Sequence, residues 1–263
     1  MLKNNNFRQE INLLDKPIWS IAEHQSKRKI NNELIINFNN GGEFILRYSL
    51  NVLPDHSNIK IFYYLFMLCQ KNNSSKIVIS RHQILKNCNL SPNKDNYEKI
   101  VETARIFSGM QIEARNCWYE NKKYKTIIFS IIYSFKYDED DNMVHFHLSD
   151  EFLNILKSSL FIQYLDFDEY KKLKKPIAAR LYELLKSKLF ANSIWKIECF
   201  KLAERLLLDE KFASKIINRV KSGIEEINKK TKFKILFEVS ESKIDNKKKI
   251  LKFMHLKDKN YIS

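Results

Sequence analysis

The chain has 263 residues, of which 44% are hydrophobic and 13% aromatic, enough for one large domain or two small domains with buried cores. It carries 46 Lys and Arg against 31 Asp and Glu, a formal net charge of +15. The longest apolar run, residues 61–69, is far shorter than the ~20 residues of a membrane span, and no signal peptide is recognisable at the N-terminus. We therefore expect a cytoplasmic protein rather than a membrane or secreted one.

The scarce glycines and cysteines exclude several common sites. The four glycines fit neither GxxxxGK[ST] nor GxGxxG, so the two usual glycine-rich phosphate-binding loops are absent. The four cysteines, Cys69, Cys88, Cys117 and Cys199, form no CxxC pair that would hold zinc or a redox disulfide. We expect reduced, buried thiols, with no metal and no cofactor.

In the first half, apolar residues run almost continuously over residues 57–70 and predict a buried helix. A short strand is predicted at residues 76–79, and Ser80 is placed to cap a second helix that ends near Asn89. A turn then precedes a third helix over residues 94–108, which has one apolar stripe.

Strands follow this third helix. We predict them at residues 111–119, 124–137 and 143–148, with an acidic turn at residues 138–141 before the last strand. A helix over residues 150–157 and a strand over residues 160–165 complete this part of the chain.

The second half repeats the order of the first. Helices are predicted from Pro176 to about residue 190, over residues 200–207, and from a cap at Asp209 to about residue 229. A short strand at residues 194–197 separates the first two helices, and a hairpin of residues 232–239 and 250–256 closes the unit. The third helix has a predicted core stripe of Phe212, Ile216, Ile217, Val220, Ile224 and Ile227.

Single positions in the two halves also correspond. Ile79 and Ile84 match Ile197 and Leu202 at an offset of 118, and at an offset of 116 the matches are Ile100 with Ile216, Val101 with Ile217, and Ala104 with Val220. The order predicts an α+β fold of two tandem winged helix-turn-helix domains, each with three helices and a β-hairpin wing. We expect a partly flexible N-terminal arm at residues 1–30, a first domain at residues 31–149 and a second domain at residues 150–263.

The positive charge lies almost entirely in the last third of the chain. Residues 1–170 contain 21 basic and 20 acidic side chains, whereas residues 171–263 contain 25 basic and 11 acidic ones, a net of +14. Such a field attracts a polyanion, because each neutralised phosphate releases condensed counterions. Two alternatives stay open: a lysine-rich solvated surface typical of an AT-rich genome, and contact with an anionic membrane.

The third helix of the second domain is the expected DNA-reading element, since the last helix of a helix-turn-helix lies in the major groove. Arg and Lys suit guanine, Asn suits adenine, and Ser bonds to bases or phosphates. The expected contacts opposite the core stripe are Lys211, Ser214, Lys215, Asn218, Arg219 and Ser222. An ordinary solvated helix surface is the alternative.

Two further sets of residues are candidate DNA contacts. The tip of the second wing is basic and suits phosphates or the minor groove through Lys243, Lys247, Lys248 and Lys249. The third helix of the first domain mixes acidic with basic residues. We therefore expect it to serve a protein–protein role or to make accessory DNA contacts through Lys94, Asn96 and Lys99.

At two places the chain resembles bacterial plasmid replication initiators of the double winged-helix type. Residues 17–20 (PIWS) with residues 26–29 (SKRK) are similar to the opening of the branch called replication initiator protein A. Residues 179–186 (ARLYELLK) are similar to the helix that opens the second winged unit in the wider family.

The resemblance implies a non-enzymatic protein that binds repeated sites (iterons) in double-stranded DNA at a plasmid origin. It further implies recruitment of host replication proteins such as helicase or its loader, and repression of the initiator's own promoter as a homodimer. A plain winged-helix transcriptional regulator is the alternative, and only the arrangement of the DNA sites separates the two.

A second alternative is enzymatic. His145 and His147 lie two residues apart on a predicted strand and therefore on one face, as in the metal site of rolling-circle nicking enzymes. Such an enzyme also needs a third ligand and a tyrosine nucleophile, for which Tyr164 or Tyr170 are the candidates. We predict no catalytic residues, because the simpler interpretation leaves both histidines on the solvent face of a wing.

Overall fold

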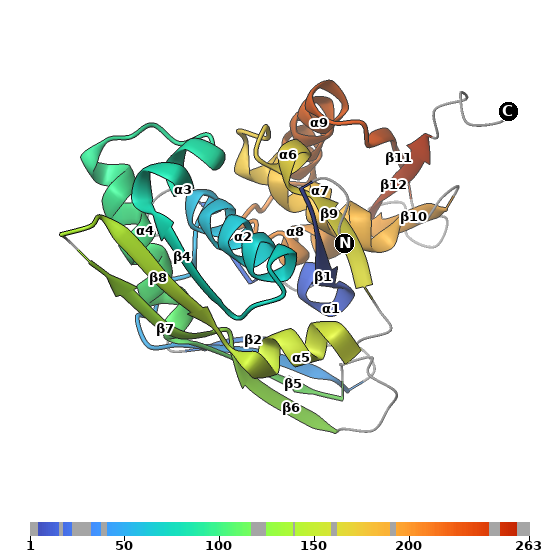
Figure 1. The fold of residues 1–263 in the computed structure, drawn as a ribbon. Coiled ribbons are helices and arrows are strands. Elements are labelled where there is room, and N and C mark those ends of the chain that lie inside the picture. The colour runs from blue at the N-terminus through green and yellow to red at the C-terminus, as the bar shows by residue number, and fades with distance from the viewer. Residues whose placement is uncertain are drawn as a thin grey trace, which may run out of the picture. The chain divides into compact units, whose positions relative to one another are not determined.

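The chain forms two compact units, Met1–Lys171 and Lys172–Ser263, in the computed structural model (Figure 1). Both units combine helices with small antiparallel sheets, which confirms the predicted α+β class. The structure describes residues 5–15, 18–22, 33–37, 41–116, 125–138, 140–158, 162–189, 193–241 and 248–256.

The helix-turn-helix of the first unit consists of α2 (His56–Lys71), α3 (Arg81–Asn87) and α4 (Lys94–Ser108), close to the predicted ranges. The carboxylate of Asp55 caps α2 by accepting hydrogen bonds from the N–H groups of Ser57 and Asn58, both at 2.9 Å. Ser80 caps α3 as predicted, accepting a hydrogen bond from the N–H of Gln83 at 3.2 Å. α2 is buried along most of its length, which explains its continuous apolar run.

A three-stranded sheet carries the first wing. It contains β4 (Lys76–Ser80), β7 (Ile132–Tyr137) and β8 (Met143–Leu148) in the order β4-β8-β7. The predicted acidic turn joins β7 to β8, where the Asp141 carboxylate accepts a hydrogen bond from the N–H of Met143 at 2.8 Å.

A separate four-stranded sheet corrects one strand prediction. Its strands β2 (Glu33–Asn37), β3 (Glu43–Tyr48), β5 (Met110–Arg115) and β6 (Thr126–Ser130) follow the order β2-β3-β5-β6. The single strand predicted at residues 124–137 is therefore wrong, because β6 pairs with β5 whereas β7 pairs with β8 in the wing. Ile131 and Ile132 are both buried where the chain passes between the sheets, so the alternation breaks there.

The middle of the four-stranded sheet holds a buried carboxylate. Only 5% of the Glu113 side chain is exposed, and it accepts hydrogen bonds from Arg47 and Arg115. The hydrogen bond from Arg47 contributes most to lowering the pKa of Glu113; burial opposes this effect, and Arg115 adds to it.

The N-terminal segment is integrated into the first unit. β1 (Asn6–Glu10) pairs with β9 (Ile162–Asp166), and α1 (Ile11–Asp15) directly follows β1. Phe7 is fully buried, with its ring 5.1 Å from that of Tyr63 on α2.

The division between the units accordingly differs from the expected boundary at residues 149/150. α5 (Asp150–Ser158), β9 and α6 (Phe167–Tyr170) belong to the first unit, since β9 pairs with β1 and α6 contacts α2. The described residues of the expected arm are likewise part of this unit, and the other residues of the range 1–30 lie outside the described ones.

The second unit follows the same plan. α7 (Pro176–Lys188), β10 (Ile194–Glu198), α8 (Cys199–Arg205) and α9 (Ala213–Lys230) precede a hairpin of β11 (Lys234–Glu241) and β12 (Lys249–Leu256). The sheet order is β10-β12-β11. Gly223 lets α9 approach α7 closely, because a Cβ there would lie 2.8 Å from Leu181 Cδ1.

The start of α9 corrects two predictions. The N-cap is Phe212 rather than Asp209, and no side chain makes a capping hydrogen bond. Phe212 is also wrong as a member of the core stripe, since it is 62% exposed. The predicted stripe is otherwise buried at Ile216, Val220, Ile224 and Ile227, with Ile217 half-buried.

The repeat inferred from the sequence is confirmed element by element. β4 and α3 correspond to β10 and α8 at the offset of 118 residues over their whole lengths. The two wing sheets share one strand order, with the second hairpin strand in the middle. Ile100 and Ile216, matched at an offset of 116, are both fully buried.

Two simpler expectations concern cysteines and membranes. Cys69, Cys88 and Cys199 are free and buried, and burial raises the pKa of Cys69 to about 12; Cys117 lies outside the described residues. In the described part of the chain, no helix is long and apolar enough to cross a membrane.

Candidate nucleic-acid interface

The solvent face of α9 collects most of the expected DNA contacts. With the stripe from Ile216 to Ile227 buried, the opposite side exposes Ser214, Lys215, Asn218, Arg219 and Lys221. These side chains follow helical spacings of three and four residues, so they form one continuous surface. Lys211 is exposed as well, in the segment that leads into the helix.

Two of these cationic side chains contact other residues of the second unit. Arg219 Nη1 lies 3.1 Å from Glu210 Oε1, and the Arg219 side chain remains 45% exposed. The Nζ of Lys215 lies 5.6 Å from the centre of the Phe212 ring. Sequence reasoning missed Glu210 and Phe212; nothing in the sequence signals the first, and helical periodicity assigned the second to the core.

Ser222 is less accessible than the rest of the set. It is half-buried, and its Oγ accepts a hydrogen bond from Lys175 Nζ at 2.6 Å. Next to it, the Glu226 carboxylate accepts hydrogen bonds from the N–H groups of Lys174 and Lys175 at 2.8 and 3.0 Å, at the N-terminus of α7. The C-terminal half of α9 is therefore hydrogen-bonded to the N-terminus of α7.

The wing of the second unit is described in part. Lys248 is exposed, and Lys249 forms an ion pair with Glu241 at 2.7 Å. The hydrogen bond from Lys249 is the main cause that lowers the pKa of Glu241. Lys243 and Lys247 lie outside the described residues.

The accessory residues of α4 have acidic neighbours. Lys94 is 87% exposed and lies 3.9 Å from Glu98. Lys99 is only 22% exposed and forms ion pairs with Asp55 at 2.9 Å and with Glu102 at 2.6 Å. Burial disfavours its charge, but the hydrogen bonds and charges of the two carboxylates outweigh burial and raise the pKa of Lys99.

Asn96 also has internal partners: its Nδ2 donates to Ser91 O at 2.8 Å, and its N–H donates to Asn93 Oδ1 at 2.9 Å. This side chain therefore holds the turn before α4. Lys99 and Asn96 are consequently engaged within the unit, whereas Lys94 remains largely exposed.

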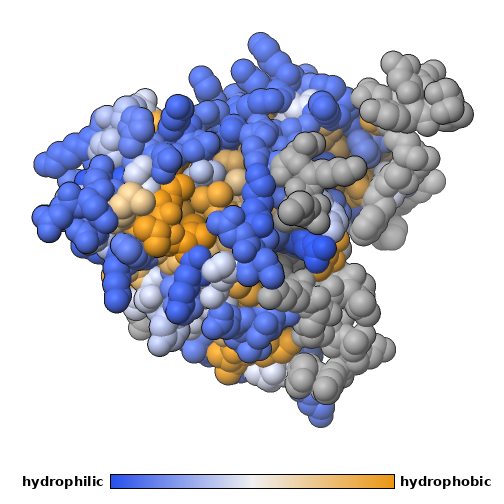
Figure 2. Space-filling model, viewed as in Figure 1, coloured by the Kyte–Doolittle hydropathy of each residue, from blue (hydrophilic) through white to orange (hydrophobic). Residues whose placement is uncertain are grey.

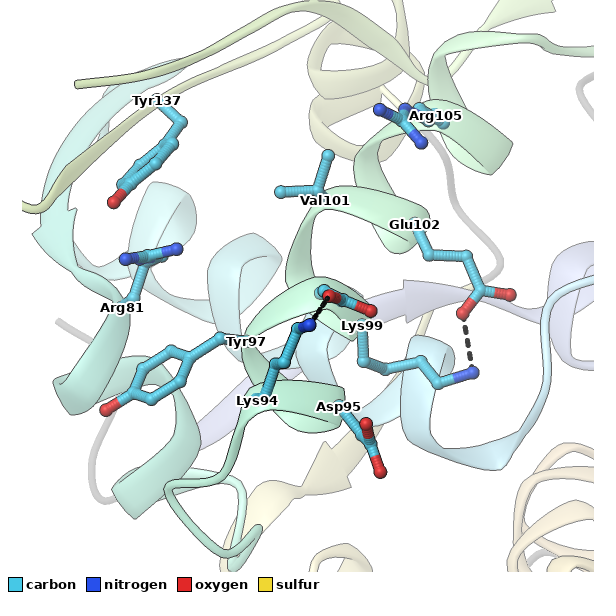
Figure 3. A pocket seen from close by; sticks show the side chains of 10 residues that line it. Arg81, Lys94, Asp95, Tyr97, Lys99, Val101, Glu102, Arg105 and Tyr137 are labelled. Carbon is cyan, nitrogen blue, oxygen red and sulfur yellow. Dashed lines mark ion pairs between the residues drawn. The ribbon is translucent and has the colours of Figure 1, made fainter. Parts of the chain in front are cut away.

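A groove of about 1120 Å³ lies along α4. Figure 3 shows the side chains that line it. Arg81 forms one wall, with its guanidinium 3.9 Å from the ring centre of Tyr137 and 5.0 Å from that of Tyr97. Its Nε donates a hydrogen bond to Asn142 at 2.8 Å. The lining includes three acidic residues, Asp95, Glu98 and Glu102, so this surface mixes both signs of charge, unlike the exposed residues of α9 from Ser214 to Lys221. Hydrophilic residues dominate the surface in Figure 2, with apolar residues gathered in patches.

The histidine pair lies on the central strand of the first wing sheet. Val144, Phe146 and Leu148 of β8 are buried, whereas His145 is exposed and His147 half-buried. The described residues contain no group of three or more His, Cys, Asp or Glu that could hold a metal ion.

The two tyrosine candidates are in the first unit. Tyr170 is fully buried, with its ring 5.2 Å from that of Tyr63. Tyr164 is 45% exposed on β9, under the guanidinium of Arg8 at 5.8 Å.

Comparison with solved structures finds the same fold. The structure of the Pi initiator protein in complex with iteron DNA matches with a TM-score of 0.63 at 15% identity, over 99% of this chain and 100% of that one. A structure of domains 2 and 3 of RctB matches with a TM-score of 0.59 at 12% identity, over 93% of this chain and 98% of that one. Another RctB domain 2–3 structure gives a TM-score of 0.57 at 11% identity, over 93% and 96%.

Sequence comparison gives the family. No curated protein matches the chain. The sequence model described as "Initiator Replication protein, WH1" matches residues 13–186, which is more than half of the chain. The winged-helix architecture of both units agrees with this match, and the chain belongs to the replication initiator protein family.

Proposed function

We propose that this protein initiates plasmid replication in the cytoplasm by binding repeated sites in duplex DNA at the origin, without catalysis of its own. Family membership supports an initiator role. The Pi initiator, whose fold is similar, was solved in complex with iteron DNA, which supports the extension to origin repeats.

The observation that carries the proposal is the exposed surface of α9 between Ser214 and Lys221. This stretch of the helix exposes Lys, Asn and Arg side chains and contains no acidic residue of its own, whereas an ordinary solvated helix mixes both signs. Glu210, which pairs with Arg219, precedes the helix. In the major groove, Lys215 and Arg219 would donate to guanine O6 and N7, and Asn218 would pair with adenine. Lys211, Ser214 and Ser222 complete the proposed set, with Ser222 released from Lys175 on binding.

The remaining candidates have supporting roles in this proposal. The second wing would contact phosphates through Lys243, Lys247, Lys248 and Lys249, and α4 would add weaker contacts through Lys94, Asn96 and Lys99. The family resemblance extends the proposal to recruitment of host helicase or its loader, and to repression of the protein's own promoter as a homodimer.

Footprinting of the full chain on the DNA flanking its gene tests the proposal. Protected direct repeats beside an AT-rich segment support an initiator, whereas a single inverted repeat inside an unrelated promoter would indicate a transcriptional regulator. Protection of no site would overturn sequence-specific binding.

Variants assign the binding to α9. Lys215→Ala or Asn218→Ala should each weaken binding to the footprinted site by about 1–3 kcal/mol and leave random duplex less affected. Lys196→Ala removes an exposed charge from the outer face of β10 and serves as the matched control for Lys215. Equal losses on specific and random DNA would show that these side chains contact phosphates only.

A further inference from the structure

Phe212 occupies an unusual position for a large apolar residue. It is the N-cap of α9, with an extended backbone (φ −117°, ψ 126°), and 62% of it is exposed. Ile216, one helical turn later, is fully buried. Because α9 begins at Ala213, Phe212 stands outside the helix and does not join the core stripe. The Phe212 ring lies on the surface of the second unit.

Stability alone does not favour phenylalanine here. Ser, Thr, Asp and Asn are preferred at N-caps, because their side-chain oxygens accept hydrogen bonds from free N–H groups of the first turn. Phenylalanine cannot do so, and the N-cap of α9 accordingly makes no side-chain capping hydrogen bond. Single exposed apolar residues are common in proteins, so exposure by itself means little. A residue that is both a poor cap and an exposed aromatic breaks two local rules at once, and such conflicts concentrate at functional sites.

The surroundings of the ring indicate what it contacts. Lys215 Nζ lies 5.6 Å from the ring centre, and Lys211 and Ser214 beside it are exposed. The ring thus belongs to the same basic surface as the proposed DNA contacts. In a helix-turn-helix, the N-terminal turns of the last helix approach the base edges most closely.

We propose that Phe212 is a specificity-determining residue that contacts the C5-methyl group of a thymine in the major groove. This inference rests on the proposed function, because it requires α9 to lie in that groove. The thymine methyl is the apolar group that base pairs present there, and aromatic side chains are among its usual contacts. Insertion of the ring between bases is a feature of minor-groove binding and does not fit a helix in the major groove.

The proposal is tested by removing the thymine methyl group from the DNA while keeping the base. The full chain first selects its preferred duplex from a randomised pool, and each thymine of that duplex is then replaced singly by deoxyuridine. Wild-type protein should lose about three- to fivefold in affinity at one thymine, or at one per repeat, the factor expected for one buried methyl group. Phe212→Ala should weaken binding to the thymine duplex by at least that factor and show no further loss with deoxyuridine.

Two further variants sharpen the test. Phe200→Ala removes another exposed aromatic ring of the second unit, on α8, and should retain the full sensitivity to the methyl group. Phe212→Asp supplies an N-cap carboxylate and should raise the melting temperature while abolishing the methyl effect. This result would separate loss of recognition from loss of folding.

Each failure has a distinct result. Selective binding that depends on Lys215 and Asn218, but with no methyl effect at any thymine, would overturn the role of Phe212 and leave the proposed function standing. Equal losses for Phe212→Ala on thymine and deoxyuridine duplexes, with a methyl effect retained, would also overturn it. Failure to select any duplex would overturn both proposals.

Discussion

Arg219 of α9 forms an ion pair with Glu210, nine residues earlier, with 3.1 Å between Nη1 and Oε1. The pair lies within the surface proposed for DNA, so a phosphate or base must compete with the Glu210 carboxylate for the guanidinium. Glu210→Gln should therefore raise affinity for random duplex up to about fivefold, in line with the small worth of exposed ion pairs. Fluorescence anisotropy at several salt concentrations measures this.

Glu43→Gln is the matched control for Glu210, because it changes the net charge equally but lies on β3 of the first unit, beside Arg115. It should leave DNA affinity close to that of the wild type. An equal gain in both variants would mean that net charge, rather than release of Arg219, controls binding.

The second wing predicts a change in salt dependence. Replacing Lys247, Lys248 and Lys249 by Ala should lower the slope of log affinity against log salt by roughly 0.9 for each phosphate that the wing no longer neutralises. Lys249 must first leave Glu241, so its share should grow in a Glu241→Gln background. An unchanged slope in the triple variant would show that the wing does not touch the DNA backbone.

Asp55 stabilises the first unit in two ways, since it caps α2 and pairs with Lys99 of α4. Asp55→Ala should lower the free energy of unfolding by about 1–2 kcal/mol. Asp55→Asn should lose less, because asparagine keeps the cap and removes only the ion pair. Urea unfolding followed by circular dichroism compares the two, and equal losses would show that the cap contributes nothing.

Glu113 should make the first unit sensitive to acid. Because its pKa is lowered in the folded state, mainly by Arg47, its contribution to stability is complete above the unfolded pKa of about 4.3. That contribution is lost as the pH falls through the lower folded-state value. Glu113→Gln should flatten the pH dependence of the unfolding free energy below about pH 4. Parallel curves for both proteins would contradict the assignment.

Periodicity predicted those elements that bury one regular face. The stripe of α9 at Ile216, Val220, Ile224 and Ile227 is one example, and the repeat of β4 and α3 as β10 and α8 is another. The same signal failed at Phe212, because spacing does not tell whether a residue lies inside a helix or caps it. An apolar run likewise cannot reveal where a chain leaves one sheet for another, as it does between β6 and β7.

For the candidate site, the sequence predicted the exposed basic surface of α9 but not its neighbours. Glu210 and Lys175 are brought beside Arg219 and Ser222 only by the packing of the second unit. The engagement of Lys99 by Asp55, 44 residues earlier, also depends on tertiary structure. The residue types therefore predicted a basic surface on α9. Which of its side chains are free of internal partners, and so able to contact DNA, depends on the tertiary structure.

In α4, Lys94 and Lys99 lie beside carboxylates, whereas the exposed residues of α9 from Ser214 to Lys221 include no acidic residue, so the two halves of the chain are chemically unlike. A protein with two chemically different halves has a direction, so it can bind a DNA site of non-palindromic sequence in only one orientation. Copies bound to direct repeats would then all face the same way. The row of bound proteins would carry a polarity that the double helix itself lacks, and with it a defined side toward which later events at the origin are directed.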